Sequence, residues 1–242
     1  MLKNKLLKLS RKIFEPLGLA LTNGSHFTDD AALKRCKERG MVINSVIDVG
    51  ASDGRWSDLC MEHFPNAQYL LVEAQAAHES SLIKYKKANK NVDYVICAAG
   101  NNDGEIYFND DALLSGAASE KSFEGGKQTK VPMFKIDTLI KNYNLKPPFL
   151  IKLDTHGFEV PIIEGSSEAL KDTNLFIVET YNFRISEKAL KYFEMCIYME
   201  KLGFSTADIV GLLSREFDKA LWQMDMFFIK TNDKVFEHNK FD

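Results

Sequence analysis

The sequence has few cysteines, and it lacks the pairing of them that a structural zinc site or a disulfide framework would need. No C-x-x-C pair occurs among the four cysteines of the 242 residues, which are Cys36, Cys60, Cys97 and Cys196. Cysteines scattered in this way are usually reduced, partly buried thiols. We therefore expect a protein of the cytoplasm that folds without disulfide or zinc crosslinks.

Long apolar runs and an excess of positive charge are also missing. No stretch approaches the ~18 apolar residues that a membrane-spanning helix needs, and lysines interrupt the N-terminal segment too often for a signal peptide. The formal net charge is −3, so no overall basic field attracts nucleic acid. The composition therefore predicts a cytoplasmic protein whose partners do not include nucleic acid.

Residues 1–40 are expected to form a helical extension, which is followed by a single main domain over residues 41–242. An amphipathic helix is predicted by the spacing, among lysines, of Leu2, Leu6, Leu9 and Ile13. Two interpretations of this helix stay open. One is peripheral contact with an anionic membrane surface; the other, which we favour, is packing on its own domain or on a second subunit of a homo-oligomer. A second helix is predicted over Asp29–Arg39, ended by Gly40.

From Val42 onward, strand and helix signals alternate along the chain. Short apolar runs predict seven strands, at Ser45–Val49, Gln68–Glu73, Tyr94–Ala98, Phe149–Leu153, Leu175–Glu179, Phe204–Val210 and Met224–Lys230. Helices are expected at 56–63, 77–88 and 187–202, the last with Ser186 as its N-cap and Gly203 at its end. This alternation predicts an α/β fold with a mostly parallel sheet and helices on both faces.

The alternation is interrupted between residues 100 and 137. Glu105–Phe108 and Lys130–Lys135 look like short edge strands. The segment Asp110–Thr129 between them is rich in glycine, serine and alanine and poor in large apolar residues, so we expect a loop. A mobile lid over an acceptor and a plain surface insertion are both compatible with this composition.

The most informative segment runs from Val46 to Trp56 and reads VIDVGASDGRW. Its loop at residues 50–54 follows a predicted strand and precedes a predicted helix, which is where ligands bind in parallel sheets. Gly50 and Gly54 allow the backbone to approach a ligand where a Cβ would clash, and the helix N-terminus points to the same place. The residues that we expect to bind a cofactor are Asp48, Gly50, Ala51, Ser52, Asp53, Gly54, Glu73, Ala98 and Asp154.

The same loop separates two classes of cofactor. A dinucleotide fingerprint G-x-G-x-x-G that started at Gly50 would need glycine in place of Ser52 and Arg55. Carboxylates at Asp48 and Asp53 would repel a pyrophosphate by like charge, whereas they suit a ligand that carries sulfonium and ammonium groups. The loop therefore favours S-adenosyl-L-methionine over a nicotinamide dinucleotide.

An acidic residue at the end of the next strand fits this interpretation without deciding it. Glu73 stands 25 residues after Asp48, and a carboxylate at that position can accept hydrogen bonds from the ribose hydroxyls of either cofactor. A nicotinamide-dependent enzyme on the same sheet and a non-catalytic cofactor-binding module therefore remain alternatives to a methyltransferase.

A second segment, Phe149–Gly165, reads FLIKLDTHGFEVPIIEG. Together with Val46–Trp56 it resembles the FkbM-type methyltransferases, which have an I-K-x-D-x-x-G-x-E segment followed by a helix and a glycine. The residues that match this pattern are Lys152, Asp154, Gly157, Glu159 and Gly165. Further similar stretches lie at 134–139, 176–179 and 223–228, so that the resemblance covers about residues 46–230.

The resemblance implies a Rossmann-like class I methyltransferase fold with a sheet of seven strands, of which the last is antiparallel. It also implies an S-adenosyl-L-methionine-dependent O-methyltransferase that acts on a hydroxyl of a sugar, a glycan or a related small molecule. Composition and spacing do not identify that acceptor. Tyr181 and Phe183 follow the fifth strand, where they would either stack on a sugar or pack in the core.

Four residues are candidates for catalysis. Asp154, at the end of the fourth strand, should face the methyl group, and His156 is placed to take the proton of the acceptor at neutral pH. Lys152 shares a side of its strand with Asp154, and it would pair with Asp154 or with Glu179 and hold the carboxylate ionised. The alternatives are a structural Lys152–Glu179 ion pair, an Asp154 that only contacts the cofactor, and a solvated His156. Asp154, His156 and Glu179 have suitable ligand types for a metal, but their spacing in the sequence predicts none.

Overall fold

The computed structural model describes residues 27–109, 116–123 and 128–241. The amphipathic helix predicted before Pro16 lies outside these residues, so its contacts and the domain boundary at residue 40 stay predictions. The second predicted helix is confirmed as α2 (Asp29–Glu38), where the Ala31 amide donates a hydrogen bond to the capping side chain of Thr28. Within the described ranges, no helix is long and apolar enough to cross a membrane.

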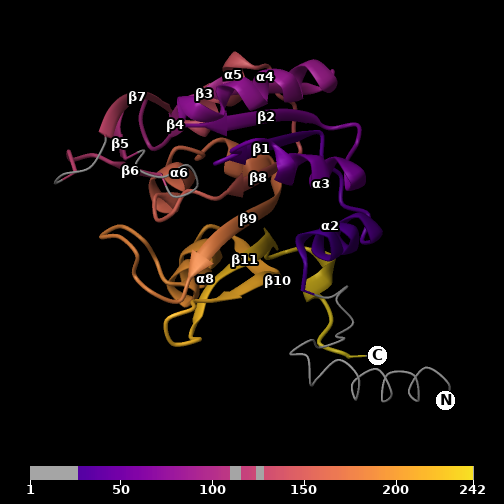
Figure 1. Cartoon of the computed structure of the whole chain (residues 1–242). Helices are drawn as coiled ribbons and strands as arrows, with labels where there is room; N and C mark the ends of the chain where they lie inside the picture. The colour runs from indigo at the N-terminus through magenta and orange to yellow at the C-terminus, as the bar shows by residue number, and fades with distance from the viewer. Residues whose placement is uncertain (1–26, 110–115, 124–127, 242) are drawn as a thin grey trace, which may run out of the picture.

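Seven strands form the main sheet, in the order β10-β11-β9-β8-β1-β2-β3 (Figure 1). Their bounds are β1 (Ser45–Val49), β2 (Gln68–Glu73), β3 (Val92–Ile96), β8 (Phe149–Leu153), β9 (Thr173–Tyr181), β10 (Phe204–Ser214) and β11 (Leu221–Lys230). β1 pairs in parallel with β2 and β8, and the parallel pairing continues to β3 and to β9. β11 runs antiparallel to both of its neighbours, β9 and β10. The predicted seven-stranded, mostly parallel sheet with an antiparallel last strand is therefore confirmed.

The central strands are apolar almost throughout because the sheet is covered on both faces. All five residues of β1 and all five of β8 are buried. Successive side chains point to opposite faces, so that Ile47 and Ile151 belong to one apolar core while Val46 and Leu150 belong to the other. The polar residues Asp48 and Lys152 fall on the same face as Val46 and Leu150 by this alternation, and both are buried.

Helices pack on both faces, as the alternation predicts. The face with Val46 is covered by α2, α3 (Arg55–His63) and α4 (Glu79–Ala88), which contribute Leu33, Cys60 and Leu82 to its core. The opposite face is covered by α5 (Ile136–Asn142), α6 (Glu159–Glu164), α7 (Ala169–Asp172) and α8 (Tyr192–Lys201). The described residues also contain two short 3₁₀ turns, η3 (Ala76–His78) directly before α4 and η4 (Lys234–Phe236) after β11.

A second, four-stranded sheet lies beside α6 at one end of the main sheet (Figure 1). Its strands, in spatial order, are β4 (Ala98–Ala99), β7 (Gln128–Phe134), β5 (Gly104–Asn109) and β6 (Ala117–Ser119). The prediction that Glu105–Phe108 and Lys130–Lys135 form edge strands is wrong for both. β7 pairs with β4 and β5, and β5 pairs with β7 and β6.

The prediction of a loop over residues 110–129 is wrong in part. β6 falls inside this segment and pairs antiparallel with β5, and β7 already begins at Gln128. The sequence pattern misses β6 because its small side chains carry no apolar alternation, although backbone pairing with β5 needs none. Residues 110–115 and 124–127 of the predicted lid lie outside the described residues.

The last helix begins later than the sequence predicts. α8 starts at Tyr192 rather than Glu187, and the Lys191 amide donates a hydrogen bond of 2.9 Å to the carboxylate of Glu194 in its first turn. Ser186 is therefore not its N-cap. The Ser186 hydroxyl instead donates to the carbonyl oxygen of Gly157, 3.1 Å away, and this tertiary contact holds the preceding segment out of the helix.

The large side chains of the core predict where the fold is most sensitive to mutation. Phe176 on β9 is fully buried and makes an edge-to-face contact with Phe204 at 5.4 Å between ring centroids. Phe176→Ala should lower the free energy of unfolding, measured by urea denaturation, by ~3–5 kcal/mol. Phe217→Ala is the matched control, because Phe217 is 90% exposed and its loss should cost under ~0.5 kcal/mol. Equal effects of the two changes would contradict this assignment of the core.

Candidate active site

The loop at residues 50–54 joins β1 to α3 and packs tightly against the end of β8. Gly50 adopts a φ of +82°, and a Cβ at this position would lie 2.0 Å from the carbonyl oxygen of Asp154. The Asp154 amide in turn donates to the carbonyl of Val49 at 3.0 Å. Only glycine allows this approach, so the two sequence segments that predicted the family meet backbone to backbone.

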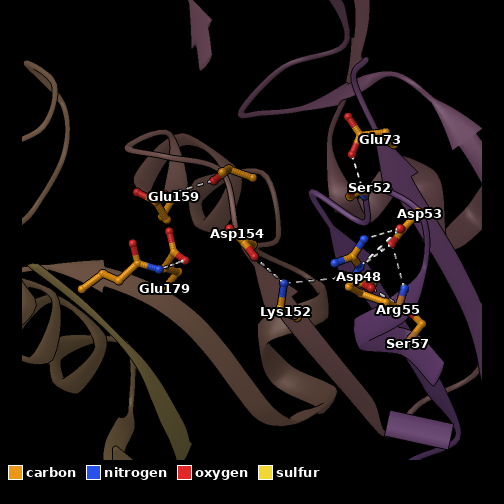
Figure 2. Close-up of polar contacts among 12 residues, drawn as sticks. Asp48, Ser52, Asp53, Arg55, Ser57, Glu73, Lys152, Asp154, Glu159 and Glu179 are labelled. Carbon is orange, nitrogen blue, oxygen red and sulfur yellow. Dashed lines mark hydrogen bonds and ion pairs between the residues drawn. The ribbon is translucent and has the colours of Figure 1, made fainter. Parts of the chain in front are cut away.

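Glu73 at the end of β2 fixes the same loop from the other side. One oxygen of its carboxylate accepts a hydrogen bond of 2.7 Å from the Ser52 amide (Figure 2). The other accepts one of 2.7 Å from the Gln75 amide. Each carboxylate oxygen has a second lone pair. Glu73 can therefore shape the loop and still accept hydrogen bonds from a ligand.

A cavity of about 380 Å³ opens beyond the ends of β1, β2 and β8. The predicted cofactor and catalytic residues that line it are Gly50, Ser52, Glu73, Ala98, Asp154, His156 and Glu179. Residues that line it without having been predicted include Gln75, His78 and Cys97 near the cofactor loop, Gln223 on β11, Phe108 and Ala118 of the second sheet, and Gly116 directly before β6. Their linear positions carry no motif, because neighbouring elements bring them to the cavity only in the folded chain.

Five of the predicted residues do not line this cavity. Asp48 is fully buried on the α3 side of the sheet and accepts a hydrogen bond of 2.8 Å from the Ser57 hydroxyl. Asp53 pairs with Arg55 at 2.6 Å on the surface. Ala51, Gly54 and Lys152 are packed behind the loop. The carboxylates that face the cavity are therefore those of Glu73, Asp154 and Glu179, rather than those of Asp48 and Asp53.

One buried lysine links the two motifs. Lys152 on β8 lies opposite Asp48 on β1, and its Nζ is 2.9 Å from Oδ2 of Asp154 and 3.7 Å from Oδ1 of Asp48 (Figure 2). The same ammonium lies 5.2 Å from the centre of the Trp56 ring. Burial alone would lower the pKa of Lys152, but the carboxylates of Asp154 and Asp48 outweigh it and raise the pKa above its usual value. Of the two partners expected for Lys152, the ion pair is with Asp154.

The loop that carries His156 is held by the glutamate of the second motif. His156 and Gly157 both have positive φ values, +53° and +100°. Glu159, which is buried, accepts a hydrogen bond of 2.8 Å from the Gly157 amide and one of 3.1 Å from the Thr155 hydroxyl. This bracing turns the chain sharply after β8, so that Asp154 and His156 both line the cavity.

Asp154, His156 and Glu179 come together at the wall of the cavity. One ligand-type atom from each lies within 4.8 Å of the other two. Glu179 is buried and accepts hydrogen bonds from the Tyr181 hydroxyl and, at 2.6 Å, from the Gln223 side chain. Burial raises the pKa of Glu179, and the nearby charge of Asp154 adds to the effect.

The two aromatic residues after β9 make contacts within the protein. Tyr181 is buried, donates to Glu179 and meets Trp222 edge to face at 5.7 Å. Phe183 stacks on Trp222 at 5.4 Å between ring centroids, and the guanidinium of Arg215 lies 4.0 Å from its ring centre. Neither residue lines the cavity.

Two acidic residues near this cluster were not predicted. Asp225 on β11 lies opposite Glu179 in the register of the sheet. Burial raises the pKa of Asp225 to about 8, and the neighbouring carboxylate of Asp29 on α2 adds to the effect. The sequence does contain a signal for Asp225 as a site residue, because its carboxyl group interrupts the apolar run Met224–Phe228 in a predicted strand.

The sequence family is shown by comparison with known proteins. The family model for the methyltransferase FkbM domain matches residues 48–206. The chain therefore belongs to this family of S-adenosyl-L-methionine-dependent methyltransferases, and S-adenosyl-L-methionine rather than a nicotinamide dinucleotide is its cofactor. No curated protein sequence matches the chain.

Solved structures with a similar fold include several methyltransferases. The FkbM methyltransferase of Methylobacillus flagellatus is 16% identical with a TM-score of 0.49, over 76% of this chain and 43% of that one, so this chain spans under half its length. The fibrillarin pre-rRNA processing protein of Methanococcus jannaschii is 12% identical with a TM-score of 0.50, over 79% of this chain and 68% of that one. The precorrin-6y C5,15-methyltransferase of Geobacter metallireducens is 13% identical with a TM-score of 0.46, over 82% of this chain and 86% of that one. The family and the sheet topology together define a Rossmann-like class I methyltransferase fold.

The position of Glu73 predicts its effect on cofactor affinity. Glu73→Ala removes a charged acceptor that faces the cavity, which should weaken the binding of S-adenosylhomocysteine by ~1.5–3 kcal/mol in a calorimetric titration. Glu62→Ala, an exposed change on α3, should leave the dissociation constant unchanged. A dissociation constant for Glu73→Ala equal to that of the unaltered protein would show that Glu73 makes no contact with the cofactor.

The raised pKa of Asp225 predicts a dependence of stability on pH. Its pKa in the folded state is about 8, above the ordinary 3.8, so the folded chain holds a proton that the unfolded chain releases. This contribution to stability is therefore lost as the pH rises from about 4 to about 8. Asp225→Asn has no such proton. Its free energy of unfolding should therefore rise relative to that of the unaltered protein as the pH increases across this range. The control Glu187→Gln, on the surface, should keep a constant offset; the same constant offset for Asp225→Asn would refute the shift.

Proposed function

We propose that this protein transfers the methyl group of S-adenosyl-L-methionine to a hydroxyl of a sugar, a glycan or a related small molecule. The observation that carries the proposal is that a single cavity joins the cofactor loop to a cluster able to handle a proton. The cavity is lined by Gly50, Ser52 and Glu73 together with Asp154, His156 and Glu179.

The side chains at the cavity fit the cofactor that the family implies. Glu73 offers carboxylate lone pairs to the ribose hydroxyls, while the Ser52 amide that it holds keeps the loop in place. Asp154 presents a carboxyl group at the cavity wall next to the cofactor loop, which suits a positively charged sulfonium. When bound, S-adenosyl-L-methionine supplies an electrophilic methyl group.

The chain's own contribution to the reaction is positioning and proton removal. An acceptor hydroxyl held beside Asp154 and His156 loses its proton to a ring nitrogen of His156 as its oxygen forms the new bond to carbon. Lys152 lies between Asp48 and Asp154, so its ion pair with Asp154 fixes the direction of that side chain. Glu179, held by Tyr181 and Gln223, lies beside His156 and stabilises the imidazolium that forms.

The choice of a small polyhydroxylated acceptor over nucleic acid rests on charge and on the size of the cavity. The net charge of −3 offers no general attraction for a polyanion. Acidic side chains at the cavity would in addition repel a phosphate backbone. The proposal also includes a location in the cytoplasm and assembly into a homo-oligomer.

The test is a methyl-transfer assay over a panel of acceptors, with nucleotide sugars, oligosaccharides, lipid-linked glycans and an RNA oligonucleotide. We expect transfer to at least one hydroxylated carbohydrate and none to RNA. His156→Ala should lower kcat ~10²-fold or more while leaving the affinity for S-adenosylhomocysteine unchanged. His238→Ala, an exposed histidine near the C-terminus, is the matched control.

Three results would contradict the proposal. Transfer to RNA alone would show that the acceptor is a nucleic acid and not a carbohydrate. Binding of S-adenosylhomocysteine without transfer to any member of the panel would favour a non-catalytic module. A kcat of His156→Ala equal to that of the His238→Ala control would remove the histidine from the reaction.

A further inference from the structure

The cluster at the acceptor side of the cavity has the composition of a cation site. Asp154 ends β8, His156 lies in the loop after it, and Glu179 comes from β9. One nitrogen or oxygen from each lies within 4.8 Å of the other two. Ligands around a Mg²⁺-like ion sit at about 2.1 Å from the metal, so neighbouring ligands are about 3 Å apart and opposite ones about 4 Å. Small side-chain rotations would therefore bring all three onto one ion.

The imidazole of His156 is free to act as a ligand. Over the part of the chain that the structure describes, no hydrogen bond to its ring joins it to another residue, although the ring lines the cavity. Glu179 is different, since Tyr181 and Gln223 orient its carboxylate by hydrogen bonds. Orientation of a carboxylate by a second layer of donors is what metal ligands commonly show. The cluster thus combines a ligand already oriented with one whose ring has no hydrogen bond among the described residues.

The balance of charge around the cluster also favours a bound cation. Asp154 and Asp48 share the single ammonium of Lys152, and Glu179 lies beside Asp154 with no ion pair to a lysine or arginine among the described residues. Asp225 adds a further carboxyl group opposite Glu179. These carboxyl groups outnumber the one ammonium beside them, and a cation among them would offset their mutual repulsion.

We propose that Asp154, His156 and Glu179 bind a divalent cation that holds the acceptor, and that the acceptor is a sugar with two neighbouring hydroxyls. This inference rests on the proposed function of the same cavity. Two carboxylates and one imidazole suit Mn²⁺ and Mg²⁺ among the common ions. Three protein ligands leave three positions of a six-coordinate ion, enough for two sugar oxygens and one water.

The cation changes the part that His156 plays. As a ligand, His156 is neutral, and the lone pair of its coordinating nitrogen is used to bind the cation. This nitrogen therefore does not take the proton of the acceptor. The cation instead lowers the pKa of the bound hydroxyl, whose O–H bond breaks with transfer of the proton to water. The oxygen then forms its bond to the methyl carbon as the carbon–sulfur bond breaks, and that electron pair stays on sulfur as a neutral thioether.

The experiment is a titration of the full chain with Mn²⁺ alone, followed by electron paramagnetic resonance of the free ion, with and without S-adenosylhomocysteine. We expect one bound Mn²⁺ per chain that excess Mg²⁺ displaces. His156→Ala and Glu179→Gln should each weaken binding at least tenfold. The matched surface controls His238→Ala and Glu216→Gln should bind as the unaltered protein does. Because Glu179→Gln keeps the shape of a hydrogen-bonded side chain and His156→Ala lies in a loop, at least one of them should fold.

The outcomes separate the cation from the proposed function. No bound Mn²⁺, or equal affinity in all variants, overturns the cation site. Transfer to a carbohydrate that persists in EDTA overturns it as well, even though the methyltransferase is then active. Bound Mn²⁺ at the three residues without any affinity for S-adenosylhomocysteine supports the site and overturns the proposed function instead. Loss of transfer in EDTA, restored by Mn²⁺ and stronger for acceptors with neighbouring hydroxyls, supports both.

Discussion

The ammonium of Lys152, buried between two adjacent parallel strands, is the interaction on which the rest of the site depends. It lies 3.7 Å from Asp48 on one strand and 2.9 Å from Asp154 at the end of the next, so the two carboxyl groups share its one positive charge. Removing one partner of such a group leaves an uncompensated charge inside the protein, which typically costs about 3–5 kcal/mol. The direction of the Asp154 carboxylate is therefore set by the core of the sheet and not by the loop that follows it. A site built on this contact inherits the rigidity of β1 and β8.

Both loops at the cavity are shaped in the same way, by a glutamate that accepts hydrogen bonds from backbone amides. Glu73 holds the Ser52 amide, and Glu159 holds the Gly157 amide. Each charged acceptor satisfies donors that a tight turn would otherwise leave unpaired, and such bonds are stronger than those between neutral groups. Both glutamates thus have a structural role. In Glu73 that role coexists with a place at the cavity wall, whereas Glu159 lies behind it.

The sequence predicts this fold well where burial is two-sided. Runs such as Phe149–Leu153 are apolar because both faces of the sheet are covered, so their continuous hydrophobicity and their length locate these strands. It fails at β6, whose alanines leave no pattern, and at the start of α8, where Ser186 contacts Gly157 instead of capping a helix. These failures share a cause, since a tertiary contact decides the local structure in each.

The candidate site shows the same division. Residues that follow a strand directly, such as Glu73 and Asp154, could be placed from the sequence because parallel strands end at one edge of the sheet. The side to which Asp48 points could have been derived from strand alternation, but its pairing with Lys152 depends on the neighbouring strand. Asp225 and Gln223 arrive from a strand at the far end of the chain, and no spacing rule links them to Asp154.

The contact between Gly50 and the Asp154 carbonyl has a consequence for how the two halves of the cavity communicate. The segments are about a hundred residues apart in the chain, yet they touch without an intervening side chain. Any ligand that shifts one of them does work on the other. Thermodynamic reciprocity then requires that the cofactor alter the affinity for the acceptor by the same factor as the acceptor alters the affinity for the cofactor. The absence of a Cβ at Gly50 thereby couples the binding of the cofactor to the binding of the acceptor.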